Sequence, residues 1–541
     1  MFMEAWDVIV LGDGPAALQA ASEAARTGSS TLMMHTHALG NPGMGVQNGL
    51  AANLQETNNR SFREDTIREG QFLCDQDIVS EATAQSIRIV DLLERRGVNF
   101  RRDAKGIPLV KEMFAHSKPR IVDAGSTTAL EIQSVCEEQA MRHGVQRRGD
   151  QIPLSLVHDN QRFVGVIVLD LTSGKVMSIQ GKALIIADGG FEGVFGTGEI
   201  GLGMDMAFRS GVGLRDMEFI EDHPMCIKDT HFHLPLGLLS DGAKIHEASG
   251  PEISLNDISA VGVSNAIRSA VQPVLDARNL GEAHLWWDGT FRRVKDRTGI
   301  DMTRQTVPLQ PEVNHTIGGL PVDQHGRCIV GTWARWFTGL YAAGDAACSG
   351  LHGASSLPGN RLLDALYIGG AAGHHAGNWV ADQSFAGHDL LNEALEQTIA
   401  DIDTMLMSNV EGPVVRVGTV MENIHAALAN TTSFDQQSLS NLLEKLNAIS
   451  IQAEQLYCDQ ESLLMNTNLV DILKTQAGLR MLIASVQSGL SRTESRGSFI
   501  RTDFPEADEE QLHHTVVNLT GTCSHLAVKK GTGGHWILPP Q

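Results

Sequence analysis

The sequence predicts an α/β fold in which a Rossmann-like domain is interrupted by an inserted α+β capping domain and followed by a C-terminal helical domain. A glycine-rich turn joins a strand to a helix near residue 12. Between about residues 226 and 312 the apolar periodicity weakens and His, Pro, Asp and Trp are frequent, which is typical of an insertion. Beyond residue 378 glycine nearly disappears and helical apolar stripes follow one another. The expected boundaries are 1–225 and 313–385 for the discontinuous first domain, 226–312 for the capping domain, 386–490 for the helical domain and 491–541 for a polar, irregular tail.

The first elements form a βαβ unit. Residues 7–11 are a short apolar run, residues 12–17 are a glycine turn, and residues 18–26 have helical composition. Gly28 ends this helix, and residues 30–34 form a second strand. Such a unit predicts a parallel sheet with helices on its faces.

Helices and strands then alternate along the first domain. Apolar residues recur at helical spacing over residues 78–97, and residues 126–142 form another helix. Residues 163–179 have the pattern of a β-hairpin, and residues 183–187 that of a buried strand. The apolar stripes of the helical domain cover residues 391–407, 421–430, 438–456 and 463–486.

The composition excludes several classes of protein. The 541 residues include 64 acidic and 42 basic ones, and the net charge of −22 argues against a nucleic-acid or anionic-membrane partner, because binding to phosphates needs clustered Lys and Arg. No window approaches about 18 uninterrupted apolar residues, so no membrane span is expected. The opening MFMEAWDVIVLG carries an acid, unlike a secretory signal. The seven cysteines are scattered without a CxxC pair, which gives no zinc or cluster framework and favours a reducing compartment. We expect a cytoplasmic protein, free or peripheral at the inner face of the membrane through a partner.

The first turn carries a dinucleotide-binding pattern. The segment VIVLGDGPAA places Gly12, Gly14 and Ala17 in a G-x-G-x-x-A arrangement between a strand and a helix. Gly12 permits the tight turn, Gly14 lets the backbone approach a pyrophosphate, and Ala17 lets the helix pack closely. The helix N-terminus then faces the anion, so we expect a bound dinucleotide here.

Five further segments carry a family resemblance. TGLYAAGDAA (338–347) is an apolar strand with a Gly-Asp end, and it leads into SGLHGASSLPGNRLLDALYIGGAAG (349–373). The other three, DMEFIEDHP (216–224), NHTIGGLPVD (314–323) and SRTESRGSFIRTDFPEADEEQLHHT (491–515), follow the patterns D-M-E-x-x-Q-F-H-P, H-x-x-x-G-G-[IV] and R-x-E-S-R-G…D-[FY]-P. In these segments the chain resembles the flavoprotein subunits of the succinate dehydrogenase/fumarate reductase family, which also includes L-aspartate oxidase.

The resemblance implies an FAD-dependent oxidoreductase with a Rossmann-like FAD-binding domain. Gln47 and Gly49 would sit beside the isoalloxazine ring, and Asp345 would reach the ribityl or ribose hydroxyls, unless it only caps a helix. The turn that begins at Asn360 would present its backbone to the pyrimidine edge of the flavin. The expected cofactor-binding residues are Gly12, Gly14, Ala17, Gln47, Gly49, Ala187, Gly344, Asp345, Asn360, Leu362 and Leu363.

One departure from the family concerns the attachment of FAD. In the membrane-bound dehydrogenases a histidine in an S-H-T-x-x-A-Q-G-G segment bonds covalently to the flavin, whereas Pro42 stands at that place in GNPGMGVQNG (40–49). Proline cannot form this bond, so we expect non-covalent FAD. Loss of the covalent bond generally lowers a flavin's potential, which disfavours succinate oxidation.

A second departure concerns the dicarboxylate site. The family holds its substrate with two arginines and two histidines, because a dianion needs fork-shaped donors and its carbons need a proton shuttle. The arginine and asparagine of the family's HGANR run align with Ser356 and Ser355, and the second arginine is missing from LPLGLLSDGAKI (234–245). The usual chemistry of fumarate and succinate is therefore not expected.

Three residues remain as catalytic candidates: His223, His315 and Arg361. His223 is kept in register with the family pattern, with a structural histidine bonded to backbone as the alternative. His315 lies one residue out of register, since strict alignment gives Asn314.

Arg361 replaces a serine of the family pattern. Its side chain either projects into the space of the lost arginine or pairs with Asp364 or Asp345 as a structural bridge. Arg335 and Lys244 are weaker alternatives for the missing positive charge.

No metal site is expected from the sequence. His231 and His233 have a strand spacing that would suit a metal ion, but no third ligand is evident beside them. A surface position without a ligand is the simpler interpretation of this pair.

Three functions are compatible with these residues. The first is a flavoprotein subunit that passes electrons between a small, anionic substrate and an iron–sulfur partner, since the chain has no cluster cysteines of its own. The second is a standalone FAD oxidase or reductase of the L-aspartate oxidase type, which the missing covalent histidine favours. The third is a non-catalytic flavin-binding component, which the intact glycine motifs disfavour.

Overall fold

The largest sheet is built around β1 (Glu4–Leu11), whose residues 8–11 are apolar and buried. β1 runs parallel to β2 (Thr31–Met34) on one side and to β8 (Lys175–Ile186) on the other, which confirms the predicted βαβ unit. The computed structural model describes residues 4–38, 49–54, 59–254, 258–331, 335–406, 414–429 and 434–540. The eight-stranded sheet has the order β15-β16-β7-β8-β1-β2-β5, with β6 paired to β7. Its other strands are β5 (Gln146–Arg148), β6 (Gln151–Asp159), β7 (Arg162–Asp170), β15 (Arg327–Val330) and β16 (Arg335–Ala342).

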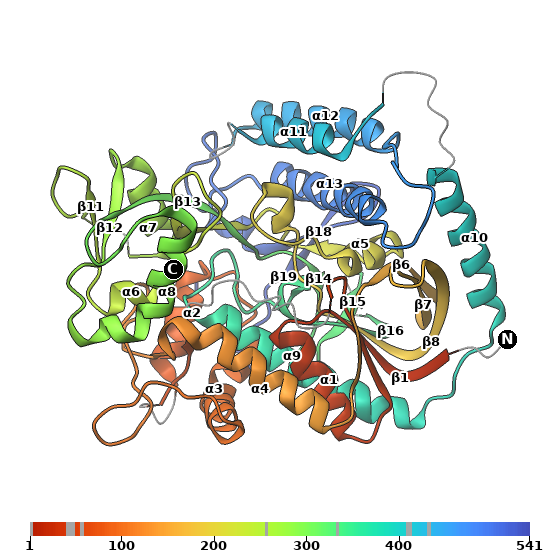
Figure 1. The fold of residues 1–541 in the computed structure, drawn as a ribbon, viewed down its shortest axis with the longest axis horizontal. Coiled ribbons are helices and arrows are strands. Elements are labelled where there is room, and N and C mark those ends of the chain that lie inside the picture. Colours follow the sequence, from red (N-terminus) through yellow and green to blue (C-terminus); the bar gives the residue numbers. More distant parts are fainter. Residues whose placement is uncertain are drawn as a thin grey trace.

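Helices α1 (Pro15–Arg26) and α9 (Asn360–Trp379) lie side by side against this sheet (Figure 1). α9 has glycine at every fourth position from Gly369 to Gly377, and a Cβ at Gly373 would come within 2.0 Å of the backbone oxygen of Ala20. The backbones of the two helices are therefore in direct contact, because the glycines of α9 have no side chain and the alanines of α1 have only a methyl group. The helical layer continues with α2 (Arg60–Glu69), α3 (Gln76–Arg96) and α4 (Thr128–Arg142), and α5 (Leu202–Arg209) packs against β6.

A second, four-stranded sheet in the order β10-β13-β12-β11 forms the inserted domain at the left of Figure 1. Its longest strands, β10 (Ile220–Ile227) and β13 (Val307–Thr316), are antiparallel and connect the insertion to the first domain. The expected limits at residues 226 and 312 thus fall inside these two strands. The remaining elements are β11 (Lys244–Glu247), β12 (Pro273–Asp276), α6 (Gly237–Ser240), α7 (Ala260–Ser269) and α8 (His284–Thr298).

The predicted helical region is confirmed. Helix α13 is buried along most of its length, and α11 and α12 pack against it (Figure 1). The four helices are α10 (Asp389–Leu406), α11 (Val417–Leu428), α12 (Gln436–Ala453) and α13 (Thr467–Ser491).

The expectation of an irregular polar tail beyond residue 491 is wrong. β18 (His513–Val517) pairs with both β19 (Cys523–Ala527) and β9 (Leu214–Arg215). Arg492 is fully buried and donates to Glu218 at 2.6 Å and to Glu494 at 2.9 Å. These polar side chains are hidden because they satisfy one another inside the molecule. Two small pairings complete the strands: β3 (Leu50–Ala51) with β4 (Ile121–Val122), and β14 (Leu320–Pro321) with β17 (Ala347–Cys348).

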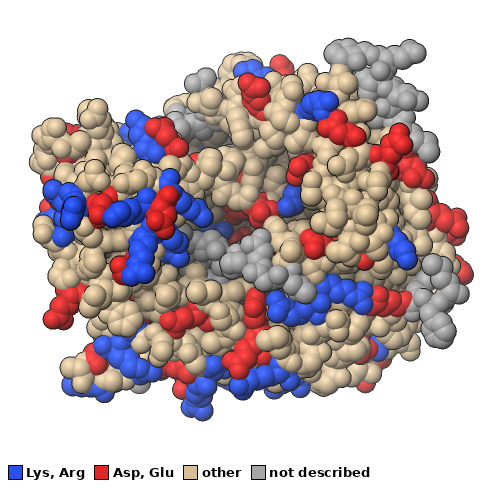
Figure 2. All heavy atoms as spheres, viewed as in Figure 1, with Lys and Arg blue, Asp and Glu red and all other residues tan. Residues whose placement is uncertain are grey.

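The surface carries charges of both signs. Figure 2 shows Lys and Arg interleaved with Asp and Glu over the visible face, with basic side chains present on the inserted domain at the left. Within the described ranges, every helix is too short or too polar to cross a membrane.

Candidate functional site

The turn after β1 forms a cradle for an anion. Gly12 has φ +117°, and a Cβ there would lie 2.1 Å from the backbone oxygen of Ala187, so only glycine fits. Gly14 is the N-cap of α1, no side chain caps that helix end, and a Cβ on Gly14 would meet open space. The free N–H groups and the positive end of the helix dipole therefore face an open space that suits a pyrophosphate.

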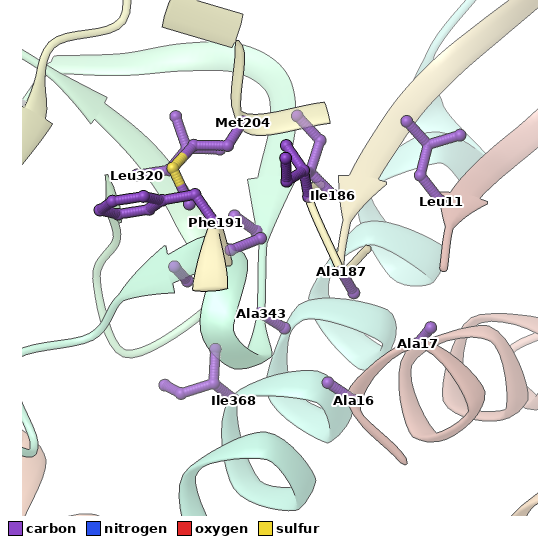
Figure 3. Packing of buried hydrophobic residues seen from close by; sticks show 14 of the residues in the cluster. Leu11, Ala16, Ala17, Ile186, Ala187, Phe191, Met204, Leu320, Ala343 and Ile368 are labelled. Atoms are coloured by element: carbon purple, nitrogen blue, oxygen red, sulfur yellow. The ribbon is translucent and has the colours of Figure 1, made fainter. Parts of the chain in front are cut away.

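Three strand ends meet beside this turn. Leu11, Ile186 and Ala342 are paired across β1, β8 and β16, so the residues that follow each strand converge at one edge of the sheet. Gly344, at φ +62°, approaches α1 so closely that a Cβ would lie 2.9 Å from the Cβ of Ala16. Figure 3 shows Ala16, Ala17, Ala187 and Ala343 gathered here with Leu11 and Ile186. The structure thus brings together the predicted residues Gly12, Gly14, Ala17, Ala187 and Gly344.

The expected flavin end lies at the start of α9. Gly359, its N-cap, has φ +87°, and a Cβ there would lie 2.7 Å from the backbone nitrogen of Ala51. Asn360 is fully buried and donates to Thr66 at 3.1 Å, but its Oδ1 has no hydrogen-bond partner in the part of the chain that the structure describes. Leu363 N–H is used within the helix, bonded to the oxygen of Gly359 at 3.4 Å. An uncapped helix start beside an unpaired acceptor fits a flavin ring with its imide edge.

Of the two positions expected beside the flavin ring, Gly49 and Gln47, the structure describes only Gly49. Gly49 has φ +89°, and its missing Cβ leaves room for Ile121, whose Cγ2 would otherwise be 2.6 Å away. Gln47, together with Pro42, lies outside the described residues. The residues that are described fit FAD, which, when bound, supplies two-electron redox chemistry.

The expected adenosine end of the site has a feature that was not predicted from the sequence. His35 follows β2, is buried, and has no hydrogen bond to either ring nitrogen from any described residue. Its Nδ1 lies 3.8 Å from Oδ2 of Asp13, and burial lowers the pKa of His35 and raises that of Asp13. The place after the second strand of a Rossmann unit is where ribose hydroxyls are bound, and that position could have drawn attention to His35.

The predicted catalytic residues line a small pocket between the FAD-binding domain and the strand pair β10–β13. Its lining includes Gly49, Gly359 and Leu362, which belong to the expected flavin environment. The pocket is also lined by residues of the two capping strands, of the loop before α9 and of α9 itself: Glu221, His223, His315, Ser356 and Arg361.

His223 is a buried, uncharged imidazole. Its Nδ1 accepts a hydrogen bond from the backbone N–H of Met225 at 3.1 Å, and its ring contacts that of His233 with centroids 5.2 Å apart. Burial lowers the pKa of His223 well below its ordinary value, and His233 and Arg361 lower it further. The proton of the neutral ring therefore belongs on Nε2.

His315 is hydrogen-bonded to the carboxylate of Glu221, a residue that was not predicted from the sequence. Its Nδ1 donates to Glu221 at 3.2 Å, and Glu221 also accepts from Ser355 Oγ at 2.9 Å and from Ser356 N–H at 2.6 Å. Burial would raise the pKa of Glu221, but these hydrogen bonds leave it lowered, so Glu221 is an anion. The pKa of His315 is lowered by burial and by Arg361.

Arg361 forms the structural bridge that was one of its two expected roles. Its Nε and Nη2 hold Asp345 at 3.0 and 2.6 Å, and its Nη1 donates to the oxygen of Asn314 at 2.7 Å. Nη2 also lies 3.4 Å from Glu192. Four of the five guanidinium N–H groups are thereby used, and the carboxylate of Asp345 is engaged by Arg361.

Three acidic side chains, those of Glu192, Asp345 and Glu221, lie around the guanidinium of Arg361. Burial and the neighbouring Asp345 raise the pKa of Glu192 to about 7, against the opposing effect of Arg361. Arg361 holds the pKa of Asp345 well below its usual range although burial opposes this. Together with Glu221, these carboxyl groups give the pocket surroundings that repel a dianion.

The weaker candidates lie elsewhere. Lys244 is exposed and pairs with Glu252 at 2.9 Å, and Arg335 pairs with Gln161 on the surface. Asp364 accepts from Ser349 at 3.0 Å and takes no part in the bridge of Arg361. Glu221 could have been noticed, because it stands where the family segment D-M-E-x-x-Q-F-H-P has glutamine; nothing local distinguishes Glu192.

Comparisons with known proteins agree with this geometry. Residues 7–362 match the model of the FAD binding domain family, and residues 426–531 match that of the fumarate reductase flavoprotein C-terminal domain. The chain is 27% identical over 563 residues to a fumarate reductase flavoprotein subunit of Mycobacterium tuberculosis, covering 95% of this chain and 94% of the relative. It is 26% identical to a succinate dehydrogenase flavoprotein subunit of Rickettsia bellii, covering 94% of this chain and 92% of the relative.

Solved structures share the fold. A chain of E. coli quinol fumarate reductase superposes with a TM-score of 0.90 at 22% identity, covering 100% of this chain and 99% of that chain. Adenylylsulfate reductase of Archaeoglobus fulgidus gives a TM-score of 0.76 at 16% identity, with 99% and 97% of the two chains covered. At these identities the likeness concerns the architecture alone.

Proposed function

Because the chain belongs to the succinate dehydrogenase/fumarate reductase flavoprotein family and is an FAD-dependent oxidoreductase, we propose that it passes electrons between a small substrate and an iron–sulfur partner. The substrate binds in the pocket of His223 and His315, and it carries at most one carboxylate. FAD is held without a covalent bond. The first two statements rest on the pocket, and the third rests on Pro42 in the sequence.

One observation carries the proposal. The same small pocket is bounded by Gly49, Gly359 and Leu362, which belong to the expected flavin environment, and by the two histidines of the capping strands. A substrate in it would lie between the redox group and two buried imidazoles. This is the arrangement that a coupled transfer of electrons and a proton requires.

The hydrogen bonds of the two histidines give them different roles. His223 keeps a proton on Nε2 and can donate it, since its Nδ1 is occupied by Met225 N–H. His315 is oriented by Glu221. Burial of these groups excludes water from the reacting atoms.

The limit of one carboxylate follows from charge. Ser355 and Ser356, at the positions of the family's asparagine and arginine, donate to Glu221 and bring no positive charge. Arg361 is already paired with Asp345. A substrate carboxylate 4 Å from Glu221 would be repelled by about 4 kcal/mol at an effective dielectric constant near 20. A dicarboxylate would meet this repulsion without a fork-shaped donor to offset it.

Anaerobic reduction of the bound flavin tests the substrate. The purified chain is mixed with dicarboxylates, amino acids, 2-hydroxy acids and sulfur oxyanions, and bleaching of the flavin absorbance is followed. We expect bleaching by a monocarboxylate or zwitterionic donor and none by succinate. Rapid bleaching by succinate would contradict the altered pocket, and a chain purified without flavin would contradict the whole assignment.

Purification from the native source tests the partner. We expect an iron–sulfur protein, identified by iron and acid-labile sulfide, to accompany the chain. Peroxide formation by the isolated chain with a donor from the panel would instead support a standalone oxidase. Acid precipitation should leave the flavin in the supernatant, whereas flavin in the protein pellet would contradict the non-covalent attachment.

A further inference from the structure

A cluster of metal-ligating side chains lies behind the pocket, on the far side of His223. Cys226 on β10, His233 on the segment that returns from β10, and Glu312 on β13 bring one ligand atom each to within 4.8 Å of the others. Sγ of Cys226 is 3.1 Å from Oε2 of Glu312, and Nε2 of His233 is 3.4 Å from the same oxygen. The cluster therefore joins three separate backbone segments at one point.

The backbone holds these residues in place. Cys226 forms an isolated antiparallel bridge with His233, and the turn between them is closed by the bond from Ile227 N–H to Phe232 O at 2.9 Å. β10 and β13 are antiparallel neighbours, with His223 opposite Glu312 and a register shift before Cys226. The shift turns Cys226 toward the same side as Glu312, which a regular strand register would not do.

Two of the three ligand separations are close to those of a tetrahedral zinc site, and the third is at most 4.8 Å. With Zn–S of about 2.3 Å and Zn–N or Zn–O of about 2.0–2.1 Å, ligand atoms lie about 3.3–3.6 Å apart. The pair His233–Glu312 already has this separation, and the pair Cys226–Glu312 needs to open by about half an ångström. Such a change lies within the reach of side-chain rotation.

The donors and their burial also suit zinc. A thiolate, an imidazole and a carboxylate are its preferred ligands, and the first two are buried here. Nε2 of His233 makes no well-aligned hydrogen bond with any residue that the structure describes, so its lone pair or proton lacks a good partner. His231 donates from Nδ1 to Oε1 of Glu312 at 2.7 Å, which is the second carboxylate oxygen. A partner of this kind orients a ligand and leaves its other oxygen for the metal.

We propose that Cys226, His233 and Glu312 bind one zinc ion, with His231 orienting Glu312. The ion fastens the turn between Cys226 and His233 to β13. It also fixes the ring of His233, which contacts the ring of His223 in the pocket. Occupancy of the site thereby controls the position of a residue that lines the pocket, without the ion touching the substrate.

Cobalt substitution provides the direct test on the full FAD-loaded chain. After treatment with a chelator, Co²⁺ is added, and one equivalent should give a thiolate-to-cobalt charge-transfer band together with the visible bands of a tetrahedral site. Zn²⁺ should abolish both. Cys226→Ser should remove the charge-transfer band, while Cys523→Ser, at a half-buried cysteine outside the cluster, should leave it unchanged.

Substitutions of the other proposed ligands and of His231 test the site further. His233→Ala and Glu312→Gln should each lower zinc affinity by at least 100-fold in competition with a chromophoric chelator, and His231→Ala should lower it by about 10- to 100-fold. Circular dichroism and flavin content check that each variant is folded. Sub-stoichiometric zinc, or a charge-transfer band that survives in Cys226→Ser, would show that the cluster is only a hydrogen-bonded network and would overturn the proposal.

Discussion

The cradle around Gly12 and the pocket around Glu221 are neighbours, yet they are built on opposite principles. The cradle consists of backbone N–H groups, a helix end and glycines, of which Gly12 lies so close to the backbone of Ala187 that a Cβ would collide with it. The pocket consists of buried charged and titratable side chains that hydrogen-bond to one another. A backbone site depends on the fold and, at a contact as close as that of Gly12, tolerates only glycine. A side-chain site can change its ligand while the fold stays, which is how one scaffold serves several substrates.

Gly12→Ala is expected to break the cradle and to have the largest effect. The new Cβ would meet the oxygen of Ala187 at 2.1 Å, in a backbone conformation that side chains rarely adopt. Strain and overlap together should lower the free energy of unfolding by about 2–5 kcal/mol. The variant should also be purified without flavin, measured as the ratio of flavin to protein absorbance.

Gly28→Ala is the matched control for this change. Gly28 also has a positive φ, +96°, but a Cβ there would meet open space. The Gly28→Ala variant should therefore lose only the free energy of unfolding that corresponds to backbone strain, about 1–2 kcal/mol, and should still bind flavin. Equal losses of flavin in both variants would show that strain, and not the contact with Ala187, decides binding.

Glu192→Gln tests how the buried carboxyl group of Glu192, near Arg361, makes the stability of the protein depend on pH. The pKa of Glu192 is raised from the ordinary value of 4.5 to about 7, so the folded state keeps a proton that the unfolded state has lost. The stability from this group is complete below pH 4.5 and is lost as the pH rises through 7, an amount of about 3 kcal/mol. Denaturant unfolding at pH 5 and pH 8 should show a smaller loss in the variant than in the wild type. Glu444→Gln, on the exposed face of α12, should leave the loss as in the wild type.

Glu221→Gln should have the smallest effect and the most specific one. Removing this anion should tighten the binding of a dicarboxylate, measured by perturbation of the flavin spectrum, by about tenfold, or about 1.4 kcal/mol. This is less than the full repulsion of about 4 kcal/mol, because the same carboxylate is the acceptor for His315, Ser355 and Ser356 and its loss disturbs the pocket. Asp222→Asn is the comparison, because Asp222 lines the same pocket but is ion-paired with Arg268. If both variants bind the dicarboxylate equally well, the general acidity of the region, and not Glu221, excludes it.

The difference between the two regions also explains which parts could be predicted from the sequence. The βαβ unit and its glycines depend on neighbours in the chain, and they lie where the pattern predicted. The partner of Arg361 could not be chosen from the sequence, because Asp364 is only three residues away, whereas the true partner, Asp345, is 16 residues away and is brought close only by the fold. The cluster of Cys226, His233 and Glu312 was missed because Glu312 lies on another strand and a single cysteine carries no metal pattern.

The C-terminal segment shows the opposite error. The segment was expected to be a polar, irregular tail, whereas Arg492 and Glu494 are fully buried, and Arg492 donates to both Glu494 and Glu218. Charge in a sequence indicates exposure only when no counter-charge is available inside. Here one of the two counter-charges of Arg492 comes from Glu218, far away in the chain, and the periodicity of the segment carries no sign of it.

The contact between α1 and α9 has a consequence for how the protein is made. The glycine row of α9 covers α1 only after the ribosome has passed residue 377, and the cradle needs Gly12, Ala187 and Gly344 together. During synthesis the N-terminal half therefore waits with an alanine-rich helix uncovered and with one edge of β8 lacking its β16 neighbour. Nascent chains in this state are prone to aggregate or to be held by chaperones. We expect flavin to enter late, when almost the whole polypeptide has left the ribosome.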